Sequence, residues 1–229
     1  MNTFFTKKAS VIMVGNPGAG KSAILNALGG DFPSGFSDLH GMTTRVSHND
    51  VKIEDRSFRL VDTPGISDPG EGGQGDERTN IRLKMLQEAM NDGLVCAIFF
   101  VISPRNGRIE PGTLALMQLV LNSMKKGPKV GLIINQVMPG HLDQVQSESY
   151  IAAVRKVLEE NKADLTFLDK QPHLVLADHE DGFSEQDRHD IKHYILGFKP
   201  KEVQIHDMLA KSLRIILMLL MAILQQAMH

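Results

Sequence analysis

Residues 15–22 carry a pattern that binds phosphate: a glycine, four free positions, and then Gly-Lys-Ser. Glycines let the backbone adopt φ values that other residues avoid, so successive N–H groups can point at phosphate oxygens. Lys21 supplies a cation for the β and γ phosphates, and the Ser22 hydroxyl is placed to hold Mg²⁺. The residues expected to surround the phosphates are Gly15, Asn16, Gly18, Ala19, Gly20, Lys21, Ser22 and Ala23.

A buried strand and a helix are expected on either side of this loop. Residues 9–14 form an apolar run typical of a buried strand, and residues 21–29 have the apolar spacing of a helix that ends at Gly29-Gly30. The helix would begin at Lys21-Ser22, where its dipole favours an anion. Because strand, loop and helix follow in the order that a phosphate-binding loop requires, we expect a nucleotide site here.

A second motif, Asp62-Thr63-Pro64-Gly65, follows the predicted strand 57–62. A carboxylate at the carboxyl end of a strand beside a phosphate loop can reach Mg²⁺, usually through water. We therefore assign Asp62 to the metal and the N–H of Gly65 to the γ-phosphate. The glycine-rich segment 66–76 would then be ordered by a triphosphate and released on hydrolysis.

Between these motifs lies Gly41-Met42-Thr43-Thr44-Arg45, in the loop before the second predicted strand. A nucleotide switch needs one threonine hydroxyl from this loop to complete the Mg²⁺ shell. Thr44 is the first choice and Thr43 the alternative, although both are also β-formers that suit the start of a strand. The predicted metal ligands are Ser22, Thr44 and Asp62.

Short apolar runs alternate with helical stretches, as in a parallel α/β sheet. The predicted strands are residues 9–14, 46–54, 57–62, 94–102, 129–135 and 173–177. The predicted helices are residues 21–29, 77–91, 112–125, 144–161, 185–196 and 203–228. We expect an α/β fold with a mostly parallel six-stranded sheet, helices on both faces and a C-terminal apolar helix. Residues 1–200 would form the nucleotide-binding domain and residues 201–229 a helical extension.

Together these motifs resemble the translation-factor-like class of P-loop GTPases. In segment 99–110 a hydrophobic strand is followed by Gly107-Arg108, an apolar residue and an acid, which resembles a box of the GIMAP family, immunity-associated nucleotide-binding proteins related to septins. Thr44-Arg45 is similar to the switch of Era-like and dynamin-like GTPases. The resemblance covers residues 9–135 and implies a switch that uses GTP or GDP and Mg²⁺. The residues assigned to catalysis are Lys21, Thr44, Arg45 and Gly65.

The base-reading motif departs from that pattern. Where Asn-Lys-x-Asp would follow the fifth strand, the chain has Asn135-Gln136-Val137-Met138. Asn135 can still hydrogen-bond a purine edge, and the stem of Gln136 can lie on the ring. Met138 has no carboxylate for the N1–H and 2-amino groups of guanine, the chief source of discrimination against adenine. Guanine specificity is therefore implied by the resemblance alone. The candidates to replace the carboxylate are Asp143, Asp178 and His179.

The position after Gly65 also departs from the GTPase pattern. Ile66 occupies the position where many fast GTPases have a glutamine that orients the attacking water. Intrinsic hydrolysis should therefore be slow, and a cation from elsewhere would have to assist, in cis or across a dimer. We expect a nucleotide-dependent homodimer made face to face across the nucleotides. The candidate cations are His40, Arg45, Arg105 and Arg108.

Composition gives no sign of a nucleic-acid partner, since the 229 residues carry a formal net charge of −2. The single cysteine, Cys96, lies in an apolar run and is interpreted as a buried small hydrophobe in a reducing compartment. The N-terminus lacks the apolar core of a secretory signal. The expected location is the cytoplasm.

The segment 215–224 is apolar on every face, but its ten residues are too few to span a bilayer. Three interpretations stay open: a helix packed on the domain, a helix packed against another chain, or a segment at a membrane interface. Contact with a membrane or a partner through residues 211–224 is the expectation under the second and third of these interpretations.

Two other functions fit the same residues. An ATP-binding P-loop protein is permitted by the weakened base motif. A scaffold that assembles through its nucleotide face, with little or no hydrolysis, is the second alternative.

Overall fold

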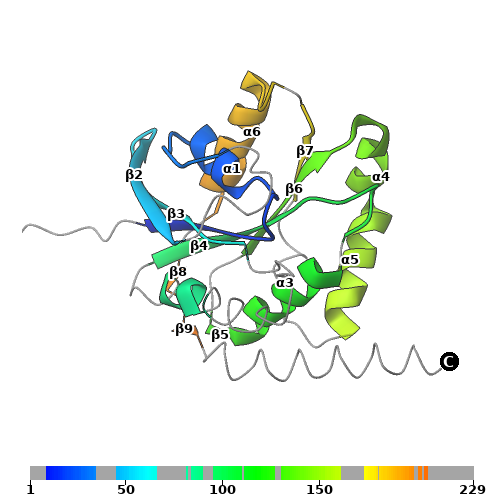
Figure 1. Ribbon diagram of the computed structural model, residues 1–229, viewed down its shortest axis with the longest axis horizontal. Helices are drawn as coiled ribbons and strands as arrows, with labels where there is room; N and C mark the ends of the chain where they lie inside the picture. The colour runs from blue at the N-terminus through cyan, green and yellow to red at the C-terminus, as the bar shows by residue number, and fades with distance from the viewer. Residues whose placement is uncertain are drawn as a thin grey trace, which may run out of the picture.

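A central sheet with helices on both faces organises the chain (Figure 1). The computed structural model describes residues 9–34, 45–65, 81, 84–89, 95–109, 111–126, 130–160, 173–179, 181–198, 201–202 and 204–205.

Six strands form the main path of the sheet, in the order β2-β3-β1-β4-β6-β7. They are β1 (Ala9–Val14), β2 (Ser47–Ile53), β3 (Arg56–Asp62), β4 (Val95–Ile102), β6 (Val130–Val137) and β7 (Leu174–Ala177). The five strands from β3 to β7 are parallel, and β2 joins β3 as an antiparallel hairpin. The six predicted strands are confirmed, each boundary within two residues. All carboxyl ends of the parallel strands therefore meet at one edge, where the predicted motifs lie.

Three short strands were not predicted. β8 (Lys201–Glu202) pairs antiparallel with β4, while β9 (Gln204–Ile205) pairs with β5 (Met124–Lys126) in a separate small sheet. The prediction that a helix starts at residue 203 is therefore wrong at Gln204–Ile205, where alternating polar and β-branched residues favour a strand. The rest of the predicted helix 203–228 lies outside the described residues, and the domain division at residue 200 stays a prediction.

The helices are α1 (Lys21–Ala27), α3 (Pro111–Ser123), α4 (Leu142–Gln146), α5 (Glu148–Glu160) and α6 (Glu185–Leu196), with a 3₁₀ turn at Pro139–His141. Residues 81 and 84–89 are helical too, inside the predicted helix 77–91. Within the described residues, no helix combines the length and apolar character needed to cross a bilayer.

The single helix predicted over residues 144–161 is wrong, because Ser147 separates α4 from α5. Its backbone is extended, with φ −68° and ψ 145°. The hydroxyl donates to the carbonyl of Gln144 at 2.6 Å and accepts from the N–H of Tyr150 at 3.3 Å. A serine with these bonds competes with the helical backbone and begins a new helix, which explains the break.

Alternate side chains of the strands pack into two cores, one on each face. Ile12 and Val14 of β1 contribute to the core that contains residues of α3 and α5. Val11 and Met13 contribute to the core that contains residues of α1 and α6. The same division is visible in Figure 1, with α1 and α6 on one side of the sheet and α3 and α5 on the other. This alternation follows from the two-residue period of a strand buried on both faces.

The hydroxyl of Tyr194 links α6 to strand β6 by hydrogen bonds. It donates to the carbonyl of Leu132 at 3.1 Å and accepts from the N–H of the same residue at 3.0 Å. Burial raises the pKa of Tyr194 well above its ordinary value, so the phenol stays protonated and can donate. The bond satisfies both backbone polar groups of a buried strand residue.

We predict that Tyr194→Phe destabilises the fold by about 1–3 kcal/mol, because it leaves the backbone groups of Leu132 unsatisfied in the core. Tyr150→Phe is the matched control, since the Tyr150 hydroxyl is buried with no hydrogen-bond partner among the described residues. Urea unfolding of both variants measures the difference. Equal losses of stability in the two would contradict the role given to the Tyr194 hydroxyl.

Candidate nucleotide-binding site

The loop that joins β1 to α1 has no room for a side chain at Gly15 or Gly20. A Cβ on Gly15 would collide with the carbonyl of Val101, and one on Gly20 would collide with the side-chain nitrogen of Asn135. Gly18 and Gly20 have φ values of 77° and 88°, which L side chains rarely adopt. Gly20 is also the N-cap of α1. The loop therefore has the close-fitting, glycine-dependent shape that a phosphate requires.

Lys21 lies buried over this loop, with its side chain turned back onto it. Its Nζ donates to the carbonyl of Gly15 at 3.1 Å and to the carbonyl of Asn16 at 2.9 Å. A lysine is almost never buried without partners, and here the loop carbonyls supply them. The positive charge is thus fixed at the phosphate loop, as the sequence predicts.

The two described metal ligands of the prediction lie in direct contact. Ser22, in the first turn of α1, donates its hydroxyl to Oδ2 of Asp62 at 2.6 Å. Asp62 is the last residue of β3 and is 1% exposed. A hydroxyl and a carboxylate are the hard oxygen ligands that Mg²⁺ prefers, so this pair fits the ion. Thr44, the third predicted ligand, and Thr43, its alternative, lie outside the described residues.

The second motif packs directly on the first. Thr63 donates its hydroxyl to the carbonyl of Met13 in β1 at 2.6 Å. Gly65 lies against Pro17 so closely that a Cβ would collide with the proline nitrogen and ring. The backbone of Gly65, with its N–H, therefore lies next to the phosphate loop, which is where the prediction requires it.

The base-reading segment also contacts the phosphate loop. Asn135 is 2% exposed, and its Nδ2 donates to the carbonyl of Ala19 at 3.0 Å, whereas its Oδ1 is buried with no hydrogen-bond partner among the described residues. Gln136 has a positive φ of 56°, and the pairing of β6 with β7 shifts register here. Met138 is 53% exposed. The segment is thus placed for a base, but without the carboxylate.

One contact of the site was not predicted. Nδ2 of Asn16 donates to the hydroxyl of Thr113 in α3 at 2.6 Å, and the buried Oδ1 of Asn16 has no partner among the described residues. The prediction placed Asn16 among the residues around the phosphates and assigned no partner to its side chain. Its sequence signal is a polar amide inside a glycine loop, but nothing in the sequence identifies Thr113 as its partner.

The candidate cations are only partly placed. Arg45 is exposed, and Arg105 and Arg108 are exposed at the ends of a tight turn whose N–H and carbonyl groups bond reciprocally at 2.9 Å. Asn106 and Gly107 between them have φ values of 49° and 71°, as in a type I′ turn. His40, Ile66 and the segment 66–76 lie outside the described residues.

The parallel sheet, the loop after β1 and the Ser22–Asp62 pair define a P-loop nucleotide-binding protein. The chain belongs to the 50S ribosome-binding GTPase family, whose sequence profile matches residues 10–136. GTP or GDP together with Mg²⁺ is accordingly the cofactor set of the site.

Two curated relatives share part of the chain. GTPase Der of Lachnoclostridium phytofermentans is 31% identical over 132 residues, which are 57% of this chain and 27% of Der. The tRNA modification GTPase MnmE of Xanthomonas campestris pv. campestris is 37% identical over 71 residues, 31% of this chain and 15% of MnmE. The chain thus matches about a quarter or less of the length of these relatives.

Solved structures share the fold at low identity. Toc33 from Arabidopsis thaliana in complex with GDP and Mg²⁺ superposes with a TM-score of 0.56 and 14% identity, over 87% of this chain and 88% of Toc33. Era, in a complex with MgGDPNP and a 16S ribosomal RNA fragment, gives a TM-score of 0.53 and 22% identity, over 85% of this chain and 59% of Era. The predicted P-loop GTPase fold is confirmed.

We predict that Lys21→Ala weakens GDP and GTP binding by about 2–5 kcal/mol, because the phosphates lose a fixed, buried cation. Lys192→Ala is the control, since Lys192 is an exposed cation on α6. Fluorescent-nucleotide titration gives both affinities, and circular dichroism checks that the variants are folded. A folded Lys21→Ala variant that binds GDP and GTP as tightly as Lys192→Ala would contradict the site.

Removal of Mg²⁺ tests the Ser22–Asp62 pair. We expect EDTA to weaken triphosphate binding by the wild-type chain and to have little further effect on Ser22→Ala, which lacks one ligand. Ser57→Ala, an exposed serine of β3, should keep the wild-type response. A wild-type affinity that ignores EDTA would refute the metal assignment.

Proposed function

We propose that the chain is a guanine-nucleotide switch that hydrolyses GTP slowly and is regulated by nucleotide-dependent dimerisation. The nucleotide-binding part of this proposal rests on one observation. Ser22 contacts Asp62 directly, and the buried Lys21 lies beside them. Both sequence relatives are GTPases by name, which supports the reaction, although each is much longer than the matched region.

The described residues have distinct tasks in this proposal. Lys21 holds positive charge on the phosphate loop, the N–H of Gly65 is placed to donate to the outer phosphate, and Ser22 and Asp62 would hold the metal. Mg²⁺, when bound, supplies further positive charge to the phosphate oxygens. Catalysis of phosphoryl transfer consists mainly of such positioning and charge stabilisation.

Slow turnover follows from the residue after Gly65. Ile66 has no group that can orient the attacking water, so the chain needs help from a cation. The rigid turn Arg105–Arg108 presents two exposed arginines beyond the end of β4, at the edge of the sheet that carries the site. In our proposal, a second copy that faces this edge supplies the missing charge. Arg45 and the segment 66–76 would lie in the same interface.

A solved structure of similar fold supports the proposal that dimerisation regulates hydrolysis. For the chloroplast translocon components Toc33 and Toc159, dimerisation is described as important for GTPase activity. Because identity to that structure is 13%, the likeness supports the fold, and dimerisation of this chain remains our proposal.

We predict that GTPase specific activity rises with protein concentration, and that a triphosphate analogue shifts the mass from monomer toward dimer. A cation delivered by a partner can accelerate hydrolysis by about a thousandfold or more. Arg105→Ala and Arg108→Ala should flatten the concentration dependence, whereas Lys52→Ala, an exposed cation on the edge strand β2, should not. Hydrolysis assays and light scattering measure both effects.

Flat specific activity with an unchanged monomer mass would contradict regulated dimerisation. A dimer that persists without nucleotide and disappears when residues 211–229 are deleted would assign assembly to the C-terminal segment instead.

Several finer assignments belong to the same proposal. The closer relationship to the GIMAP family rests on Gly107-Arg108 and its neighbours. The net charge of −2 supports the absence of a nucleic-acid partner, while the Era structure of the same fold contains RNA. We place the protein in the cytoplasm, at a membrane surface if residues 211–224 attach it there.

Experiments can distinguish this proposal from the two alternative functions. Equal competition by ATP and GDP would favour an ATP-binding protein, which the missing carboxylate at Met138 permits. Nucleotide-dependent assembly without measurable hydrolysis would favour a scaffold.

A further inference from the structure

The site lacks a carboxylate at Met138, yet a purine needs an acceptor there if guanine is to be preferred. We propose that Asp178, at the end of the neighbouring strand β7, supplies the carboxylate that reads the N1–H and 2-amino groups of guanine. This inference rests on the proposed guanine-nucleotide function and names the residue that decides its base specificity.

The pairing of β6 with β7 brings Asp178 to the required place. Val137 is paired with Ala177, and the N–H of Asp178 donates to the carbonyl of Val137 at 2.9 Å. Neighbouring strands lie about 4.8 Å apart, so the residues that follow Val137 and Ala177 lie side by side. Asp178 therefore stands beside Met138 at the same edge of the sheet, and both residues are exposed.

The same corner of the sheet is joined to the phosphate loop. Asn135, three residues before Met138, bonds the carbonyl of Ala19 and fills the space beside Gly20. A purine whose phosphates occupy the loop reaches the carboxyl ends of β6 and β7 from this side. In this proposal its Watson–Crick edge would lie where the loop after β7 begins.

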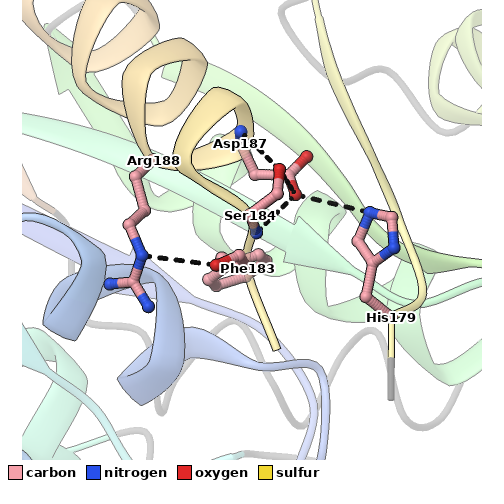
Figure 2. Close-up of polar contacts among 5 residues, drawn as sticks. All are labelled: His179, Phe183, Ser184, Asp187 and Arg188. Carbon is pink, nitrogen blue, oxygen red and sulfur yellow. Dashed lines mark hydrogen bonds and ion pairs between the residues drawn. The ribbon is translucent and has the colours of Figure 1, made fainter. Parts of the chain in front are cut away.

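Contacts with α6 hold that loop in place (Figure 2). Nε2 of His179 lies 3.4 Å from Oδ2 of Asp187, and the same oxygen accepts from the N–H of Ser184 at 2.9 Å and from its hydroxyl at 2.6 Å. The N–H of Gly182 closes a turn onto the carbonyl of His179 at 3.2 Å. Asp178 therefore sits between a strand pairing and a tethered histidine, and such preorganisation favours binding.

These contacts also separate Asp178 from the other candidates. Nε2 of His179 contacts Asp187, so this nitrogen holds the loop to α6. Asp143 lies in the first turn of α4, whose Val145 is completely buried. Asp143 belongs to this helix, whereas Asp178 follows the strand that pairs with β6.

The test replaces the hydrogen-bond acceptors of Asp178 with an amide that can also donate. In xanthine a carbonyl replaces the 2-amino group of guanine, so an amide that donates suits xanthine and a carboxylate suits guanine. Asp178→Asn in the full chain should weaken GDP binding by about tenfold to a hundredfold and strengthen binding of xanthosine diphosphate. Asp181→Asn is the matched control, because it makes the same change at an exposed position of the same loop.

A gain of xanthosine diphosphate affinity cannot arise from misfolding. Met138→Asp in the Asp178→Asn background should restore GDP binding, since Met138 is exposed and adjacent. Titrations with GDP, ADP and xanthosine diphosphate provide the readout.

Three results would overturn the inference: an unchanged preference of Asp178→Asn for GDP over ADP, an exchange of preference in Asp143→Asn instead, or equal affinity of the wild type for GDP and ADP. The first two results, obtained while the wild type still prefers GDP, refute base reading by Asp178 and leave the proposed function intact, whereas the last refutes the guanine preference of the proposed function as well. A wild-type chain that binds neither nucleotide refutes the proposed function, and this inference with it.

Discussion

The hydrogen bond between Ser22 and Asp62 depends on most of the architecture around it. The serine is placed by the start of α1 and the carboxylate by the end of β3, and the two meet because β1 and β3 are parallel neighbours. Thr63 secures the same junction by its bond to Met13. A hydroxyl and a carboxylate held 2.6 Å apart would supply two of the six oxygen ligands of a magnesium shell.

Local patterns made most of this predictable. The strand before Gly15, the glycines of the loop and the helix after Lys21 are encoded within twenty residues, so their physics is visible in the sequence. The helix break at Ser147 was not predicted, because a serine within a helical pattern does not indicate by itself that a new helix begins there. The bond from Asn16 to Thr113 spans 97 residues, and sequence spacing cannot indicate such a pair.

The base site was predictable only in outline. The sequence identified Met138 as a gap and left Asp143, Asp178 and His179 as equal candidates. The pairing of Val137 with Ala177, the buried Val145 of α4 and the ion pair of His179 with Asp187 distinguish them. Each of these contacts joins segments that are distant in sequence or depends on a side-chain rotamer. Tertiary packing therefore decides what the motif leaves open.

The bond from Asn16 to Thr113 has a mechanical consequence. Thr113 lies in the first turn of α3, and the far end of this 13-residue helix continues directly into β5, which pairs with β9. A helix of that length is a stiff rod of about 20 Å. One helix thus connects the contact at the phosphate loop with the strand pair that contains Gln204–Ile205.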